Sequence, residues 1–172
     1  KNNNIISKFE GKSRYFENYY NVEKKSWAKN VFSYNSIIQK NVYEGVDVNL
    51  YKKEGFLKYE ILVKPYTDPK IIKLKYDGVE DIWLEEGRLF INTSVNKIIE
   101  HAPYAYQIIN GEEKGVECNY SLKNKVLSFV FPKNYNEKYD LIIDPILDFS
   151  TYSGSFSDNF GYTATYDNFG FL

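Results

Sequence analysis

The stretch 46–63, VDVNLYKKEGFLKYEILV, decides the fold of this chain. Apolar and polar residues alternate on both sides of Glu54 and Gly55. Alternation with a period of two is typical of a strand that buries one face, and a short turn with glycine is typical of a hairpin. The stretch therefore predicts two antiparallel strands, 46–53 and 56–63.

The same pattern recurs along most of the chain, separated by turn signals. Asn110-Gly111 is the strongest of these, because this pair favours the two-residue turns of hairpins. Residues 85–87 and 123–125 mark two further hairpins, and 22–30 is the only segment in which a helical turn would fit. The expected strands are 13–20, 31–39, 46–53, 56–63, 71–76, 81–84, 88–93, 97–102, 104–109, 116–122, 126–131 and 139–144.

Many short strands without a convincing helix predict an all-β fold, an antiparallel β-sandwich over residues 1–148. The chain has 172 residues, 43% of them hydrophobic and 18% aromatic, which is enough to form a sizeable core. We expect Trp83 and Phe90 to face each other or the same core across the hairpin at 85–87. Trp27 is also expected in the core, because tryptophan is highly buried on average.

Charge and composition exclude several classes of protein. The net charge is -1, the charges are interspersed, and Arg14 and Arg88 are the only arginines, so we expect no nucleic-acid binding. No run approaches the roughly 20 apolar residues of a membrane-spanning helix. Methionine is absent even at position 1, so we expect a processed chain or a piece of a longer one.

Single reactive residues give no catalytic or metal-binding pattern. His101 is the only histidine, and no nucleophile with an orienting carboxylate accompanies it. Cys118 is the only cysteine; it rules out an internal disulfide and fits a buried apolar position. One histidine and one cysteine cannot build a structural zinc site, which takes four such ligands.

Pairs of carboxylates are candidate catalytic groups, because glycosidases use two. Glu85-Glu86 and Glu112-Glu113 fall in expected turns, where acidic side chains are usually solvated. Asp47 and Asp144 stand in or beside strands, which is less usual, and Asp144 before Pro145 is expected to accept backbone hydrogen bonds at a strand end. We expect no catalytic, cofactor or metal site and no enzymatic activity.

Residues 149–172 differ in composition from the rest of the chain. Asp-Asn-Phe-Gly occurs twice, at 158–161 and 167–170, in a stretch rich in glycine, serine and aromatic residues. The carboxylate and amide oxygens of this repeat could bind calcium, but Asx-turns explain the same residues and the spacing does not fit an EF-hand.

Four stretches resemble a bacterial extracellular β-domain, and 40–78 and 140–162 are its specific parts. In 40–78 the resemblance rests on a pattern of residues: Lys40, Asn41, Tyr43, Gly45, Asp47, Leu50, Tyr51, Leu57, Tyr59, Pro65, Asp68 and Pro69. KSWAKNVFSYNSI, HAPYAYQIINGE and LIIDPILDFSTYSGSFSDNFGY are also similar to that family, so that the resemblance covers about residues 14–172.

In that family the domain directly precedes a β-propeller built from SBBP repeats. The stretch 150–155, STYSGS, resembles the opening of such a repeat, with Ser155 in place of its second glycine. The resemblance implies that 149–172 is the truncated start of the first repeat, and that the remaining blades are partners within a longer chain.

The resemblance also implies a source and a location. Such proteins are typical of Bacteroidota, where they are secreted or displayed on the cell surface, are often exported by the type 9 secretion system and are linked to gliding motility. It therefore predicts an extracellular module and, as partners, outer-membrane components of that system.

Two functions remain open from the sequence. The first is a non-catalytic module with an adhesion or scaffold role at the head of a large surface protein. The alternative is a carbohydrate-binding module that stacks sugars on Trp27, Trp83 or exposed tyrosines. Three or more exposed coplanar aromatic rings would favour the second.

Overall fold

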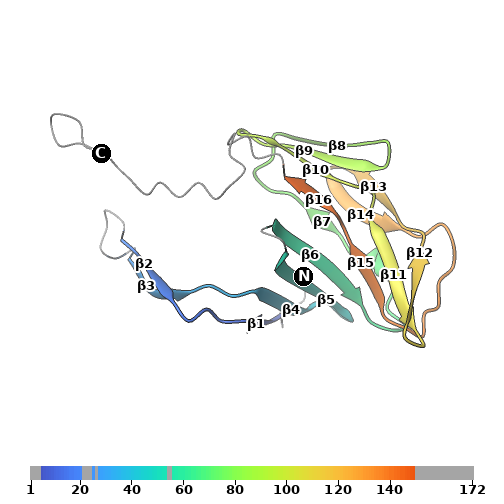
Figure 1. Cartoon of the computed structure of the whole chain (residues 1–172). Coiled ribbons are helices and arrows are strands. Elements are labelled where there is room, and N and C mark those ends of the chain that lie inside the picture. The colour runs from blue at the N-terminus through green and yellow to red at the C-terminus, as the bar shows by residue number, and fades with distance from the viewer. Residues whose placement is uncertain (1–4, 21–24, 26, 54–55, 150–172) are drawn as a thin grey trace.

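The computed structural model describes residues 5–20, 25, 27–53 and 56–149. The fold is all-β, as predicted (Figure 1). A 3₁₀ turn, η2, spans Pro69–Ile71. The strands are β1 Ile6–Glu10, β2 Phe16–Tyr19, β3 Ala28–Phe32, β4 Ser36–Tyr43, β5 Val46–Lys53, β6 Phe56–Val63, β7 Leu74–Lys75, β8 Asp81–Glu85, β9 Arg88–Asn92, β10 Lys97–Glu100, β11 Tyr104–Ile109, β12 Glu112–Val116, β13 Asn119–Lys123, β14 Val126–Val130, β15 Leu141–Asp144 and β16 Leu147–Phe149.

The strands form four antiparallel sheets. The largest has seven strands in the order β1-β4-β5-β6-β15-β11-β12. A four-stranded sheet, β16-β10-β9-β8, and a three-stranded sheet, β13-β14-β7, lie over one end of it, and β2 and β3 pair as a separate ribbon (Figure 1). Strands β6, β15 and β11 are joined from distant parts of the chain.

The hairpin formed by β5 and β6 lies at the centre of the large sheet. Lys53 pairs with Phe56, so β5 and β6 are joined by two residues. Val46, Ile61 and Val63 are each 1% exposed, which confirms the predicted alternation of a buried and an outward face.

The core lies between the large sheet and the two smaller sheets. Each of these sheets contributes buried side chains to it. They are Ile61 and Ile143 from the large sheet, Leu89 from the four-stranded sheet, and Leu127 and Phe129 from the three-stranded sheet. We call this part of the molecule, residues 36–149, the body. The face of the large sheet that carries Ile61 and Ile143 is its inner face, and the opposite face is its outer face.

Residues 5–35 extend away from the body as an arm (Figure 1). Strand β1 joins the arm to the edge of the large sheet through β4, and the β2–β3 ribbon forms its far part. None of the described residues of the arm is buried. The arm therefore lacks a core of its own.

Trp83 and Phe90 form a cross-strand pair between β8 and β9, as predicted. Their rings are stacked, with centroids 5.3 Å apart, and Phe90 is buried. The expectation for Trp27 was wrong. It lies on the arm with 37% of its surface exposed, because no second layer covers the ribbon.

Three local expectations were also wrong. The expected strand 71–76 begins instead as η2, because Asp68 caps the turn by accepting from the Lys70 backbone N–H, at 3.0 Å, and Pro69 fits the first turn. The expected strand 31–39 is divided between β3 and β4. Glu112-Glu113 lie in β12 rather than in a turn, because Ile109 pairs with Glu112 and Asn110-Gly111 alone form the predicted turn.

Strand β16 pairs with β10 and so belongs to the four-stranded sheet. It crosses position 148, at which the first domain was expected to end. Residues 150–172 lie outside the described residues, and the start of a propeller repeat there stays a prediction.

Candidate functional site

A row of polar side chains crosses the outer face of the large sheet. Asn49 on β5 pairs with Glu60 on β6, and Asp144 on β15 pairs with Tyr104 on β11. Because Ile61 pairs with Ile143, Glu60 and Asp144 are neighbours at the next outward position. Asn49, Glu60, Asp144 and Tyr104 therefore lie side by side on four adjacent strands, and we call them the polar row.

Two acceptors of the polar row have no hydrogen-bond donor. The Asn49 amide donates from Nδ2 to Glu60 Oε1 at 3.0 Å, but Asn49 Oδ1 is unpaired. Asp144 Oδ1 is covered and unpaired as well. Asp144 was expected to accept backbone hydrogen bonds at a strand end, and no such bond reaches this oxygen. Buried polar atoms normally have a partner, so each exception calls for an explanation.

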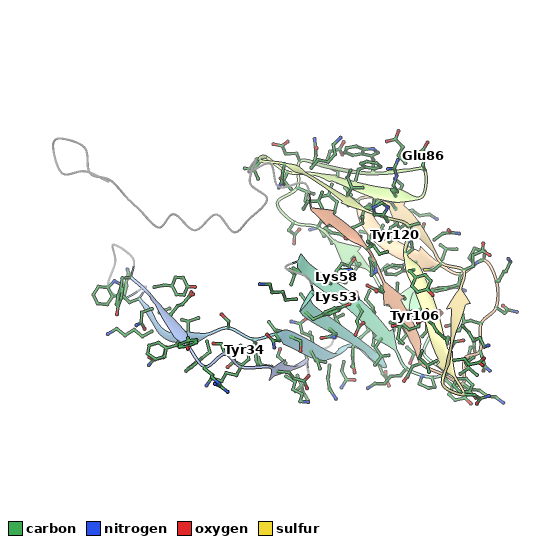
Figure 2. The ribbon with its side chains drawn as sticks, in the orientation of Figure 1. Tyr34, Lys53, Lys58, Glu86, Tyr106 and Tyr120 are labelled. Carbon is green, nitrogen blue, oxygen red and sulfur yellow. The ribbon has the colours of Figure 1, made fainter. Side chains whose placement is uncertain are left out.

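Tyrosines flank the polar row on both sides. Tyr104 and Tyr106 stack with ring centroids 5.5 Å apart and planes inclined by 26°. Tyr51 lies on β5, one outward position from Asn49, and Figure 2 shows Tyr106 on β11. The hydroxyl of Tyr104 donates to Glu113 Oε1 at 2.6 Å, which holds its ring in place.

The charges of this face act on one another. Burial raises the pKa of Asp144, and the nearby Glu60 charge raises it further, whereas Lys58 and Lys53 lower it. Burial also raises the pKa of Tyr51 and of Tyr106, with a further contribution from the Asp144 and Glu60 charges. These mutual effects on the pKa are those expected of side chains that the strand register places next to one another.

A second polar cluster is buried between the sheets. Glu100, on β10, is 1% exposed, and its carboxylate accepts from Tyr59 at 3.3 Å, Tyr76 at 3.3 Å and Tyr120 at 3.1 Å. Figure 2 shows Tyr120 within the body. Burial raises the pKa of Glu100, while the three tyrosine hydroxyls lower it. Strand β6 belongs to the large sheet and β13 to the three-stranded sheet, so this carboxylate links three sheets and serves the fold.

A cleft of about 720 Å³ lies between the loops 66–70 and 131–138. Tyr66 is 74% exposed at its edge, and its backbone N–H donates to the Glu137 carbonyl at 2.9 Å. The rings of Phe131 and Tyr135 are inclined by 57°. This cleft therefore does not present coplanar aromatic rings.

Among the described residues, most of the exposed large aromatic side chains lie on the arm. Aromatic pairs recur along it: Phe9 with Tyr34 at 5.1 Å, Phe16 with Phe32 at 5.8 Å and Tyr20 with Trp27 at 4.9 Å. The exposed large apolar residues of the arm are Ile6, Phe9, Tyr15, Phe16, Tyr19, Tyr20, Trp27, Val31 and Tyr34.

The family model described as "Domain of unknown function (DUF7948)" matches residues 1–146. The chain belongs to this family. Searches among curated proteins and among solved structures gave no match. The DUF7948 match covers the arm and nearly all of the body, including the whole polar row.

The residues weighed from the sequence do not assemble into a catalytic site. His101 follows β10, and its backbone N–H donates to the Ile146 carbonyl at 2.9 Å. Cys118 is buried as predicted, which raises the pKa of its thiol to about 12. Asp47 accepts from the Asn41 N–H at 2.8 Å and lies 3.6 Å from Lys64 Nζ, so it holds the irregular start of the β4–β5 pairing.

Among the described residues, no group of three His, Cys, Asp or Glu side chains could hold a metal ion. The acidic and amide residues of the two Asp-Asn-Phe-Gly copies lie outside the described residues, so the calcium alternative there stays open. No helix in the described part of the chain is long and apolar enough to cross a membrane.

Sequence reasoning missed both polar clusters. Glu100 is two residues from Ile98 and so lies at an inward position of its strand. A carboxylate at an inward position indicates a buried polar cluster and could have been recognised in the sequence. Asn49 and Glu60 face each other once the two-residue turn at 54–55 fixes the register. The approach of Asp144 and Tyr104 depends on pairing between distant strands, which no local pattern shows.

Proposed function

We propose that this chain is a non-catalytic module of a large secreted or cell-surface protein, with a role in adhesion or as a scaffold. One observation carries the proposal: the arm extends from the body and exposes nine large apolar side chains. Contiguous exposed apolar surface normally marks an interaction site. Residues 5–35 also carry six basic and three acidic side chains, so the arm combines aromatic contacts with a positive charge.

A non-catalytic role fits the arrangement of carboxylates. A glycosidase places its two carboxylates on either side of the bond that it cleaves. Glu60 and Asp144 lie next to each other on one sheet face instead. The cleft between loops 66–70 and 131–138 does not include either of them.

Export by the type 9 secretion system is part of this proposal, and its support is the resemblance alone. An antibody against the purified chain should label intact cells of the source organism and should lose that label after surface proteolysis. Labelling only after cell lysis would contradict an extracellular module.

The adhesion role can be tested with the whole chain on a quartz crystal microbalance. The substrate is a methyl-terminated surface, and the variant is Tyr15→Ser with Tyr20→Ser, two arm residues that are 84% and 61% exposed. We expect this double variant to lose at least half of the adsorbed mass. The matched control, Tyr66→Ser with Tyr104→Ser, removes two exposed tyrosines of the body, and an equal loss there would refute a specific role of the arm.

Carbohydrate binding is the second candidate function. The observation that favours it is the stacked pair Tyr104–Tyr106 on the outer face, with Tyr51 on the same face. Retention of the whole chain in native gels loaded with neutral polysaccharides is its test.

A further inference from the structure

The outer face of the large sheet carries a polar arrangement that the fold does not need. Like charges on neighbouring strands destabilise a sheet, and here Glu60 and Asp144 occupy adjacent outward positions at its centre. Asn49 Oδ1 and Asp144 Oδ1 lack donors as well. A sheet selected for stability alone would not keep this combination.

We propose that the polar row and its flanking tyrosines form a binding site for a neutral oligosaccharide, which lies across β5, β6, β15 and β11. The inference rests on the carbohydrate-binding function proposed above, and it adds the site, its residues and the chemical class of the ligand.

Hydroxyl groups supply what the polar row lacks. A sugar hydroxyl can donate one hydrogen bond and accept others, so it can donate to Asn49 Oδ1 and Asp144 Oδ1 and leave the face without added charge. A ligand that donates to both Glu60 and Asp144 also moderates their repulsion. The side chains of Lys53 and Lys58, whose charges act on Asp144, are long and exposed or half-exposed, so they can adjust when the ligand binds.

The tyrosines supply the apolar part of the site. The C–H face of a sugar ring packs on an aromatic ring, and Tyr104 and Tyr106 present two rings inclined by 26°. Tyr51 on β5 and Tyr106 on β11 are three strands apart, so the site spans about 14 Å across the strands at the usual spacing, and the two residues are also offset along the strand direction. A site of this length takes an oligosaccharide rather than a single sugar.

A metal ion fits the same site less well. The charges of Lys58 and Lys53 act on Asp144, and they would repel a divalent cation there. The two lysines with the two carboxylates leave a mixed surface, which suits a neutral ligand. A cation remains a distinct outcome of the test.

The experiment uses the whole chain in native gels loaded with cellulose derivatives, xylan, mixed-linkage glucan or starch, followed by calorimetry with an oligosaccharide of the retarding polymer. The variants are Asp144→Ala and Tyr106→Ala, and the matched control is Tyr66→Ala in the cleft. We expect each outer-face variant to weaken binding at least tenfold and the control to change it less than twofold.

Thermal unfolding separates a binding role from a structural one. Asp144→Ala removes one of two like charges, so we expect its melting temperature to equal or exceed that of the wild type while its affinity falls. A parallel loss of affinity and stability would overturn the assignment of Asp144 as a ligand-binding residue.

Three further results would overturn the inference, and they differ from one another. Binding that survives both outer-face variants but not Tyr66→Ala would move the site to the cleft and leave the carbohydrate function standing. No retardation by any polymer would remove both the site and the function. Binding that EDTA abolishes would show that an ion, not the polar row itself, holds the ligand.

Discussion

The body and the arm use the same kinds of contact in different surroundings. Phe129 and Tyr120 in the body pair at 5.8 Å, and Phe16 and Phe32 in the arm pair at the same distance. Phe129 is 2% exposed, whereas Phe16 is 51% exposed. The free energy of such a pair comes mainly from the surface that it removes from water, so equal geometry does not mean equal stability.

The polar contacts repeat this difference. In the body, three tyrosine hydroxyls donate to the buried Glu100. In the arm, Tyr19 donates to Glu17, and both residues are exposed. Water can replace the second contact but not the first, so only the body contact should contribute strongly to folding.

The largest expected effect tests the aromatic comparison directly. Phe129→Ala should lower the free energy of unfolding by about 4 kcal/mol, because it leaves a cavity in a close-packed core. Phe16→Ala should lower it by less than about 1 kcal/mol, since half of that ring already contacts water. Urea unfolding followed by circular dichroism measures both. Similar losses would mean that the arm is packed against something in solution.

The buried carboxylate gives the next largest effect. Glu100→Ala leaves three tyrosine hydroxyls without an acceptor, and we expect a loss of about 3 kcal/mol. Glu17→Ala is the matched change in the arm and should leave the free energy of unfolding unchanged within error. If Glu100→Ala proved as stable as the wild type, the tyrosines would have to pair with one another or with water.

The sequence predicts the features of body and arm that depend on neighbouring residues. Alternation in 46–63 gave the strands, and the short turn fixed which residues of β5 and β6 face each other. Asn110-Gly111 likewise fixes the start of β12, although acidic residues directly after such a pair favour the turn as well. Local patterns sufficed here because each hairpin is set by neighbouring residues.

The sites were not predictable in the same way. Glu100 meets Tyr59, Tyr76 and Tyr120 from three separate segments, and the polar row joins the hairpin at 46–63 to strands that begin about 40 and 80 residues further on. The exposure of Trp27 was missed for a related reason. Trp27 lies just before β3, and its residue type favours a core position, but no second sheet covers the ribbon, and this depends on the whole fold.

The pH dependence of stability tests the burial of Glu100. Its pKa is raised in the folded state from the ordinary value of 4.5, so the folded protein holds the proton more tightly than the unfolded chain. The stabilisation is fully present below pH 4.5 and is lost as the pH rises through the folded pKa, with a slope of up to about 1.4 kcal/mol per pH unit.

Glu100→Gln removes this titration and provides the comparison. The free energy of unfolding of the wild type minus that of Glu100→Gln should fall as the pH rises from 4 to 8 in urea titrations. A difference that is flat or that rises with pH would show that the three hydroxyls outweigh the effect of burial.

The smallest expected effect compares two lysines that lie over aromatic rings. Lys97 Nζ is 5.3 Å from the Trp83 ring in the body, and Lys12 Nζ is 3.6 Å from the Phe32 ring in the arm. Lys97→Gln should lower the free energy of unfolding by about 0.5 kcal/mol, a typical value for an exposed cation–π contact.

The shorter contact, that of Lys12, should contribute nothing to global unfolding, because the arm can open while the body stays folded. It should still stabilise the ribbon itself, so Lys12→Gln should speed amide exchange in β2 and β3 about twofold and leave exchange in β9 unchanged. Hydrogen exchange resolved by residue measures this. The contrary result would be that Lys12→Gln speeds global unfolding and leaves exchange in the ribbon unchanged. It would mean that arm and body unfold as one cooperative unit.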